Sequence, residues 1–249
     1  MDKHTYDEFL GGRLKIAQHS DGHRSGTDAV LLAAAIGLNA GEKALELGCG
    51  AGAASLCLAA RVPQAHTHGV DIDPELVALA CSNAETNHFE SADFAVQDIH
   101  APLSVWTLQE GYDHVFANPP FYSPRSTQHP PNTAKKTAHI ARPDTIEVWV
   151  RRAVGLVKGR GYVTFIHLAE ALPALLDAMA PRLGGLEVLP LAPKAGLPAK
   201  RILVRGRRDS KAAMRLLSPL VMHEPEGGYT PIVEEILRHG AALDWGKAG

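Results

Sequence analysis

The stretch Glu46-Leu47-Gly48-Cys49-Gly50-Ala51-Gly52 decides the predicted fold. It lies between a short apolar run that predicts a strand and a longer one that predicts a helix. Glycines at alternating positions let the backbone turn tightly and approach a ligand that a Cβ would exclude. Nineteen residues after Gly52, Asp71 stands at the end of a second predicted strand. A carboxylate there can accept both hydroxyls of a ribose, so the two features together predict a nucleoside site in a doubly wound α/β fold.

The spacing of these glycines helps to distinguish between the cofactors that contain a nucleoside. Dinucleotide sites use Gly-x-Gly-x-x-Gly and rest a pyrophosphate on the helix N-terminus. Here the spacing is Gly-x-Gly-x-Gly, and Glu46 directly ahead of it would repel a pyrophosphate but suits a cationic amino-acid tail. The combination resembles the first motif of the S-adenosylmethionine-dependent methyltransferases, which implies S-adenosyl-L-methionine as the cofactor. The residues alone leave open an NAD site and a glycine turn that only packs.

The rest of the chain alternates short apolar runs with helical patterns, which is typical of a mostly parallel sheet covered on both faces. An amphipathic helix capped by Thr27 or Asp28 is expected ahead of the sheet. The expected strands cover 44–47, 68–72, 94–96, 113–117, 162–166, 186–189 and 202–204, and the expected helices cover 27–36, 53–62, 74–87, 145–157 and 168–179.

A second motif, Asn118-Pro119-Pro120-Phe121-Tyr122, follows the fourth expected strand. A planar amine is a poor nucleophile because its lone pair is delocalised. If the Asn118 oxygen and the Pro119 carbonyl both accept its hydrogens, the nitrogen is pushed toward tetrahedral geometry and its lone pair is exposed. Phe121 can stack on the planar group, which is worth ~1–3 kcal/mol per base. The motif resembles that of amino-methyltransferases acting on adenine N6, guanine N2 or glutamine N5, whereas two prolines that merely end a strand are the plainer alternative.

A third stretch narrows the resemblance: Arg24-Ser25-Gly26-Thr27-Asp28-Ala29-Val30-Leu31-Leu32, just ahead of the first expected strand. Together with the two motifs above, it resembles the family of bacterial tRNA methyltransferases that modify adenine N6 next to the anticodon of a valine tRNA. The resemblance covers roughly residues 10–208. It implies a Rossmann-like, doubly wound, mostly parallel sheet of seven strands, of the class I methyltransferase type.

The resemblance also implies roles for individual residues, and it implies an RNA substrate, namely a tRNA. The target amine would be held by Asn118, Pro119, Pro120 and Phe121. The cofactor would be bound by Arg24, Thr27, Glu46, Gly48, Gly50, Gly52, Asp71, Ile72, Asp98, Ile99 and Asn118.

Other targets remain open at this point. A guanine-N2 ribosomal RNA methyltransferase is the nearer rival, although the Gly26-Thr27-Asp28 helix start fits it less well. A glutamine-N5 methyltransferase of release factors carries a helical domain ahead of its cofactor domain, for which the residues before the first strand leave no room. A cofactor-binding RNA-associated protein without turnover is a further alternative.

The charge is distributed unevenly along the 249 residues, although the net charge is only −2. Residues 1–125 hold 7 Lys and Arg against 16 Asp and Glu, whereas residues 126–249 hold 18 against 11. A local basic field can bind a polyanion whatever the net charge, and its phosphate contacts would position RNA without reading its sequence. The loop 123–142 contains helix-breaking Pro and Asn residues. They are typical both of a catalytic lid and of an ordinary surface loop. The predicted RNA-binding residues are Arg125, Lys135, Lys136, Lys200, Arg201, Arg205, Arg207 and Arg208.

Composition restricts the classes of protein to which this chain can belong. A chain with 45% hydrophobic and 21% charged residues is expected to fold as a globular protein. No apolar run approaches the ~18 residues of a membrane span, and the first residues lack a signal-peptide core, so a cytoplasmic protein is expected. His66 and His68 have no third ligand nearby, and no metal site is predicted. We expect one domain over 1–249: a segment 1–40 that completes the cofactor site, a Rossmann-like core 41–208 and an extension 209–249.

Overall fold

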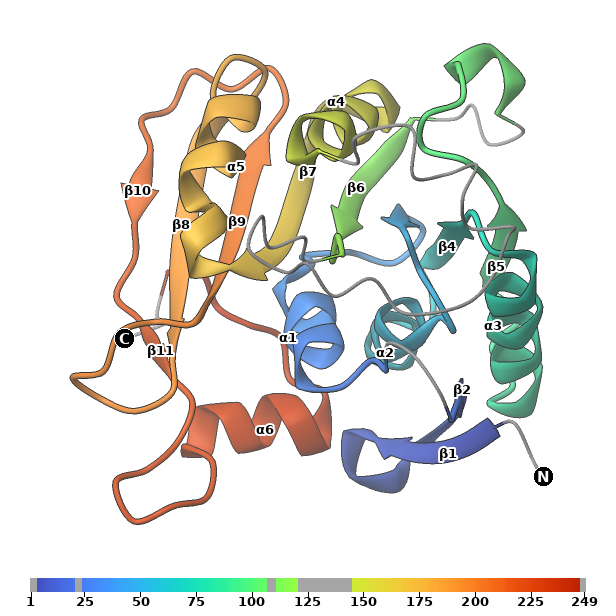
Figure 1. Cartoon of the computed structure of the whole chain (residues 1–249), viewed down its shortest axis with the longest axis horizontal. Coiled ribbons are helices and arrows are strands. Elements are labelled where there is room, and N and C mark those ends of the chain that lie inside the picture. Colours follow the sequence, from blue (N-terminus) through green and yellow to red (C-terminus); the bar gives the residue numbers. More distant parts are fainter. Residues whose placement is uncertain (1–3, 21–23, 107–110, 121–144, 247–249) are drawn as a thin grey trace, which may run out of the picture.

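A central, mostly parallel sheet organises the protein (Figure 1). The computed structural model describes residues 4–20, 24–106, 111–120 and 145–246. Neighbouring strands follow the order β10-β8-β9-β7-β6-β3-β4-β5, and β11 also pairs with β8. Within this sheet β9 runs antiparallel to β7 and β8. The strands are β3 Lys43–Leu47, β4 His66–Asp71, β5 Ala92–Val96, β6 Tyr112–Ala117, β7 Val157–Leu168, β8 Gly184–Ala192, β9 Arg201–Arg207, β10 Arg215–Leu216 and β11 Leu220–Val221.

Both faces of the sheet are buried, and successive side chains along a strand alternate between two hydrophobic cores. Val115 and Phe165 face the core that α4 and α5 cover, whereas Phe116 and Ile166 face the core that α1, α2 and α6 cover. Apolar residues on both sides explain why these strands appear as continuous apolar runs. The helices are α1 Thr27–Ala35, α2 Ala53–Arg61, α3 Pro74–Thr86, α4 Ile146–Leu156, α5 Leu172–Met179 and α6 Pro231–His239, with short 3-10 turns at Leu10–Gly12, Leu103–Val105 and Ala169–Ala171.

The expected fold class is confirmed, and each expected strand and helix of the core lies within a few residues of an observed one. The expected strand count of seven is wrong, because the described residues already form nine strands in the main sheet. The two extra strands, β10 and β11, have two residues each and lie beyond residue 208. Strands this short have no apolar alternation by which a sequence could reveal them.

The helix ahead of the sheet also differs from its expected character. It was expected to be amphipathic, but every residue from Ala29 to Ala35 is buried. Contacts with α2, α6 and β7 enclose it on several sides, which explains why no polar face is needed. Its N-cap is Gly26 rather than Thr27 or Asp28, and no side chain caps it.

Two parts of the chain had no counterpart among the expected strands and helices: an N-terminal hairpin, and the C-terminal segment that includes α6, which packs against α1. The first is a hairpin, β1 His4–Phe9 paired with β2 Leu14–His19, which lies beside α6 (Figure 1). The second is the C-terminal segment, in which Trp245 is buried and its indole Nε1 donates to the carbonyl of Ala35 over 3.0 Å. No helix in the described part of the chain is long and apolar enough to cross a membrane.

The topology brings the predicted site segments to one edge of the sheet. In the parallel registers Leu47 lies beside both Val70 and Ala117, and Asp71 lies beside Val96. The residues that follow β3, β4, β5 and β6 therefore meet where these strands end. We call this the carboxyl edge, and it is where open α/β sheets bind ligands.

Candidate active site

The glycine loop, residues 48–52, connects β3 to α2 at the carboxyl edge. Gly48, Gly50 and Gly52 all have positive φ angles, of 69°, 53° and 85°. A Cβ on Gly48 would lie 2.7 Å from the Trp149 ring, and one on Gly52 would lie 2.9 Å from the Phe94 ring. A Cβ on Gly50 would meet no atom of the described residues within 4 Å. The outer glycines thus allow close packing of the loop, whereas Gly50 faces the open space that a ligand needs.

Asp71, the last residue of β4, is hydrogen-bonded to this loop. Its Oδ2 accepts from the amide of Gly50 over 2.9 Å, and its Oδ1 accepts from the amide of Asp73 over 3.0 Å. A carboxylate has about four lone-pair positions, so each oxygen still has room for one donor from a ligand. The arrangement fits a ribose diol at Asp71. Ile72, which follows it, has an exposed side chain.

Asp98 and Ile99 follow β5 in a loop that α4 holds in place. The Oδ1 of Asp98 accepts from the amide of His100 over 2.8 Å, and Ile99 is buried. Arg152 donates through Nε to the carbonyl of Ile99 over 2.8 Å and through its terminal nitrogen to that of Ala101. Its guanidinium lies 5.0 Å from the ring centre of Trp106. The sequence contains no motif that marks Arg152, whose role depends on α4 packing beside this loop.

Asn118 directly follows β6 and carries the most informative atom of the site. Its side-chain oxygen is buried and accepts no hydrogen bond from any described residue. A buried acceptor without a partner costs ~1–3 kcal/mol, so a donor from a ligand would relieve a cost present in the free protein. Pro119 is buried behind it and Pro120 is exposed. Phe121 lies outside the described residues, as do Arg125, Lys135 and Lys136.

Glu46 is a buried carboxyl group on β3. Its Oε2 accepts from the amide and the hydroxyl of Ser55, over 2.9 and 2.6 Å. Burial raises the pKa of Glu46 to about 8; the two Ser55 bonds counteract this in part, and the nearby charge of Asp71 adds to it. A cationic group beside Glu46 would favour its ionised form. The sequence predicts such a partner for Glu46 in the ammonium group of the cofactor.

The raised pKa predicts how the stability of the protein depends on pH. The native state holds a proton on Glu46 that the unfolded chain has released, so the stabilisation is complete below about pH 4.5 and is lost as the pH rises through about 8. Glu46→Gln places a neutral side chain at this position that does not ionise in this pH range. Relative to this variant, the free energy of unfolding of the wild type is expected to fall over that range. Urea unfolding at several pH values measures it, and two parallel stability profiles would contradict it.

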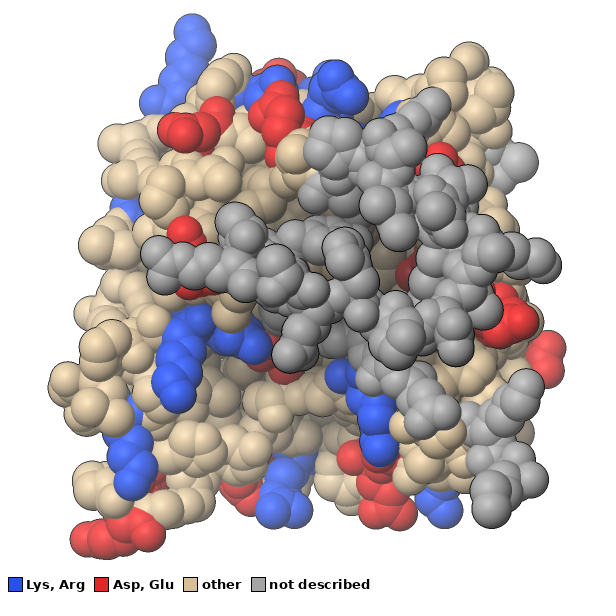
Figure 2. Space-filling view, in the orientation of Figure 1, with Lys and Arg blue, Asp and Glu red and all other residues tan. Residues whose placement is uncertain are grey.

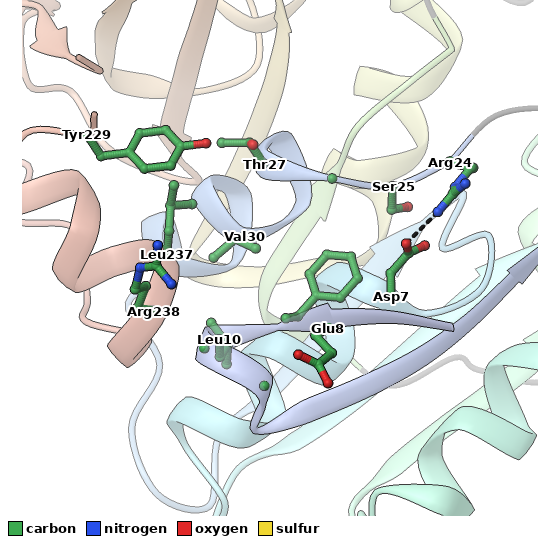
Figure 3. Close-up of a pocket in the computed structure, with 14 residues that line it drawn as sticks. Asp7, Glu8, Leu10, Arg24, Ser25, Thr27, Val30, Tyr229, Leu237 and Arg238 are labelled. Atoms are coloured by element: carbon green, nitrogen blue, oxygen red, sulfur yellow. Dashed lines mark hydrogen bonds and ion pairs between the residues drawn. The ribbon is translucent and has the colours of Figure 1, made fainter. Parts of the chain in front are cut away.

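The segment before α1 is attached to the hairpin. Arg24 forms an ion pair with Asp7 of β1, and Figure 3 shows this pair beside Ser25 at one end of a groove. The groove, of about 500 Å³, lies between the hairpin, the start of α1 and α6, and Thr27 lines it. Asp28 instead pairs with Arg201 Nε over 2.9 Å. Arg24 and Thr27 thus lie together, with the Arg24 guanidinium directed to Asp7.

The predicted RNA-binding residues of β9 do not share one edge. Arg201 pairs with Leu168 at the carboxyl end of β7, whereas Arg207 pairs with Tyr162 near the other end of the sheet. Arg208 donates to the carbonyls of Val154 and Val157. Lys200 precedes Arg201 and lies with it at the carboxyl edge. On the face seen in Figure 2, Lys and Arg side chains are interspersed with Asp and Glu rather than gathered in one band.

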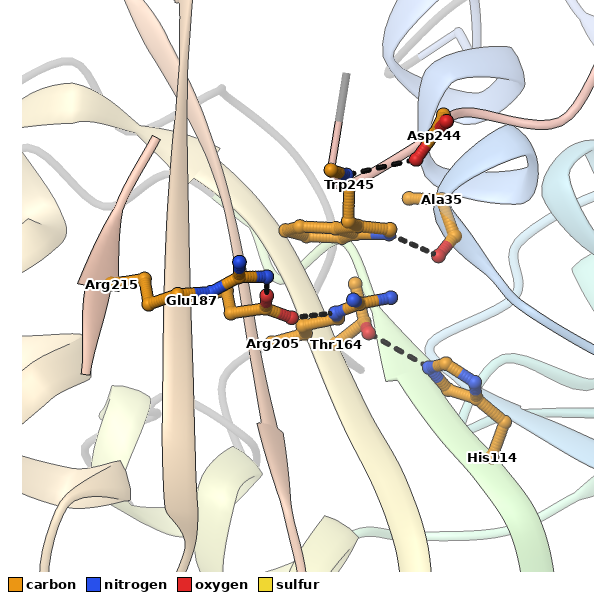
Figure 4. Close-up of polar contacts among 9 residues, drawn as sticks. Ala35, His114, Thr164, Glu187, Arg205, Arg215, Asp244 and Trp245 are labelled. Carbon is orange, nitrogen blue, oxygen red and sulfur yellow. Dashed lines mark hydrogen bonds and ion pairs between the residues drawn. The ribbon is translucent and has the colours of Figure 1, made fainter. Parts of the chain in front are cut away.

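Arg205, in the middle of β9, is occupied by contacts within the protein. Its guanidinium lies 4.1 Å from the ring centre of Trp245 and forms an ion pair with Glu187, to which Arg215 also binds (Figure 4). Only 18% of the Arg205 side chain is exposed. These contacts assign it to the packing of the C-terminal segment, and they leave little of its charge for a phosphate.

Comparisons with known proteins agree with this geometry. The pattern of a family described as "Methyltransferase domain" matches residues 38–178. A Porphyromonas gingivalis protein named tRNA1(Val) (adenine(37)-N6)-methyltransferase is 30% identical over 90% of this chain and 91% of its own. A Photorhabdus laumondii protein of the same name is 26% identical over 95% of this chain and 93% of its own. The crystal structure of a predicted O-methyltransferase from Agrobacterium tumefaciens has 25% identity and a TM-score of 0.73, covering 87% of this chain and 98% of its own.

Proposed function

This chain belongs to the methyltransferase domain family and to the family of the tRNA1(Val) (adenine(37)-N6)-methyltransferases, and on that premise we propose that it methylates N6 of an adenine in a tRNA. The observation that carries the proposal is the buried Asn118 oxygen without a partner among the described residues, located at the carboxyl edge beside the glycine loop. An acceptor in that position matches the hydrogen of an exocyclic amine. S-adenosylmethionine is the methyl donor of this enzyme class.

The residues at the carboxyl edge fit that cofactor. Gly50, with no described side chain beside it, would admit a nucleoside; Asp71 would accept from the ribose hydroxyls, and Asp98 and Ile99 would hold the base. Burial raises the pKa of Glu46, and a neighbouring ammonium group would favour its ionised form and pair with it. When bound, the cofactor supplies an electrophilic methyl group on a sulfonium whose leaving group is a neutral thioether.

Asn118 and Pro119 would act on the adenine amine. Their two oxygens accept its two hydrogens and direct the nitrogen lone pair toward the methyl carbon. The nitrogen would take the methyl group as its bond to the sulfur breaks, and the methylated, cationic nitrogen would then release one proton to water. Orientation and placed acceptors supply most of the acceleration in such a displacement. Because the amine is otherwise engaged in pairing or stacking, the base must be unpaired or flipped out.

The proposal is tested with the purified chain, methyl-labelled S-adenosylmethionine and separate pools of tRNA, ribosomal RNA and protein. The tRNA comes from a strain that lacks this gene, so that the target is unmodified. Label is expected in tRNA and, after digestion to nucleosides, in N6-methyladenosine. Label on guanine of ribosomal RNA or only on protein would overturn the proposal in favour of the rival targets. A tRNA substrate also leads us to expect the protein in the cytoplasm.

A further inference from the structure

Two adjacent residues of β2, Ala17 and Gln18, lie between the glycine loop and the segment that precedes α1. Both are buried: the side chain of Asn83 binds the backbone of Ala17, and the side chain of Gln18 binds the backbone of Ser25. β2 belongs to the hairpin and lies outside the matched residues 38–178. Its contacts show what the hairpin contributes to the site.

Asn83 of α3 joins Ala17 to the glycine loop. Its Oδ1 accepts from the amide of Ala17 over 2.8 Å, and its Nδ2 donates to the carbonyl of Ala17 over 3.0 Å. The same Nδ2 donates to the carbonyl of Ala51 over 2.9 Å. The side chain is 2% exposed. Through one buried amide, the position of β2 and the position of the glycine loop depend on each other.

Gln18 connects β2 to the segment that precedes α1. Its Oε1 accepts from the amide of Ser25 over 2.7 Å, and its Nε2 donates to the carbonyl of Ser25 over 3.0 Å. Nε2 also donates to Asp7 Oδ2 over 2.7 Å, while Asp7 Oδ1 binds Arg24. In Figure 3, Asp7, Arg24 and Ser25 lie together on the approach to Thr27.

Asn87, the C-cap residue of α3, binds the hairpin in the same way as Asn83 but does not contact the glycine loop. It accepts from the amide of Lys15 over 3.0 Å and donates to the carbonyl of Lys15 over 2.8 Å, which repeats the contact of Asn83 with Ala17. Its remaining donor contact goes to the carbonyl of Asn83, not to the glycine loop. The contact with Ala51 thus distinguishes Asn83 from a residue that only secures the hairpin.

We propose that Asn83 and Gln18 are positioning residues that couple the glycine loop to the segment 24–27 for cofactor binding. The inference rests on the proposed function, in which both segments bind S-adenosylmethionine. Neither residue touches the cofactor: each acts through the backbone it holds. Loss of either residue therefore weakens cofactor binding and leaves the transfer step intact once cofactor and RNA are saturating.

The test compares Asn83→Ala with Asn87→Ala, because both remove a clamp on β2 and only the first releases Ala51. Affinity for the product S-adenosylhomocysteine is measured by calorimetry well below the melting temperature of each variant. With one net hydrogen bond at stake, Asn83→Ala is expected to bind about fivefold more weakly and Asn87→Ala within about twofold of the wild type. The KM for S-adenosylmethionine should rise by the same factor, with kcat unchanged. Equal effects of the two substitutions would overturn the inference.

Gln18→Ala provides a second, independent measurement. It too is expected to weaken S-adenosylhomocysteine binding about fivefold, and an unchanged affinity would contradict the coupling. The Asn83→Ala Gln18→Ala double variant should lose less than the product of the single losses, because the two act on one arrangement. If Asn83→Ala does not fold, Gln18→Ala decides alone. A wild-type protein that binds no S-adenosylhomocysteine would refute the proposed function itself, which separates that failure from a failure of the coupling.

Discussion

Replacing Asn118 with alanine is expected to lower kcat by about 10²–10³-fold, the range seen when one placed polar group at a reacting centre is removed. The buried side-chain oxygen has no partner among the described residues, so it is available to accept from the amine. Without it the amine keeps its planar geometry and its delocalised lone pair. Initial rates of methyl transfer to tRNA at saturating cofactor measure the effect.

Two controls separate this role from a general loss of the site. S-adenosylhomocysteine affinity of Asn118→Ala should fall far less than kcat does, because the predicted ribose and loop contacts come from other strands. Asn118→Asp retains an oxygen acceptor and should retain more activity than Asn118→Ala. A kcat for Asn118→Ala equal to that of the wild type would refute the assigned role.

Replacing Asp71 with alanine is expected to weaken S-adenosylhomocysteine binding by at least about 100-fold, because two charge-assisted hydrogen bonds to the ribose hydroxyls, each worth about 1.5–3 kcal/mol, would be lost. The substitution also leaves the amide of Gly50 without its acceptor, which loosens the glycine loop. Calorimetric titration gives the dissociation constants.

Asp73→Ala is the matched control for this prediction. Asp73 lies two residues further on and its carboxylate caps α3 by accepting from the amide of Glu75 over 2.9 Å. Its loss should cost about 1 kcal/mol of stability, the usual value of an N-cap, and leave the affinity nearly unchanged. If both aspartate substitutions weakened binding equally, the special role of Asp71 would be disproved.

Much of the core was predictable because its determinants are local. The apolar runs of β3, β4 and β6, and the glycines between β3 and α2, specify strands and a tight turn through backbone preferences and short-range periodicity. Parallel pairing then brings the ends of these strands to one edge, so Asp71 and Asn118 could be assigned to it before any coordinates. The hairpin was missed because its short strands have no strong apolar alternation: Ala17 and Gln18 are both buried.

The chain by itself determined the order of the core elements, the glycine loop and the residues that end each strand, since each follows from a residue and its close neighbours. Only the tertiary structure decided which side chains meet. Asn83 reaches Ala17 across 66 residues, and Arg201 reaches Asp28 across 173. It also divided the basic residues of β9 between two ends of the sheet and directed Arg205 inward. Such contacts depend on how distant segments pack. The residues next to a polar side chain in the sequence do not indicate which distant group it will bind.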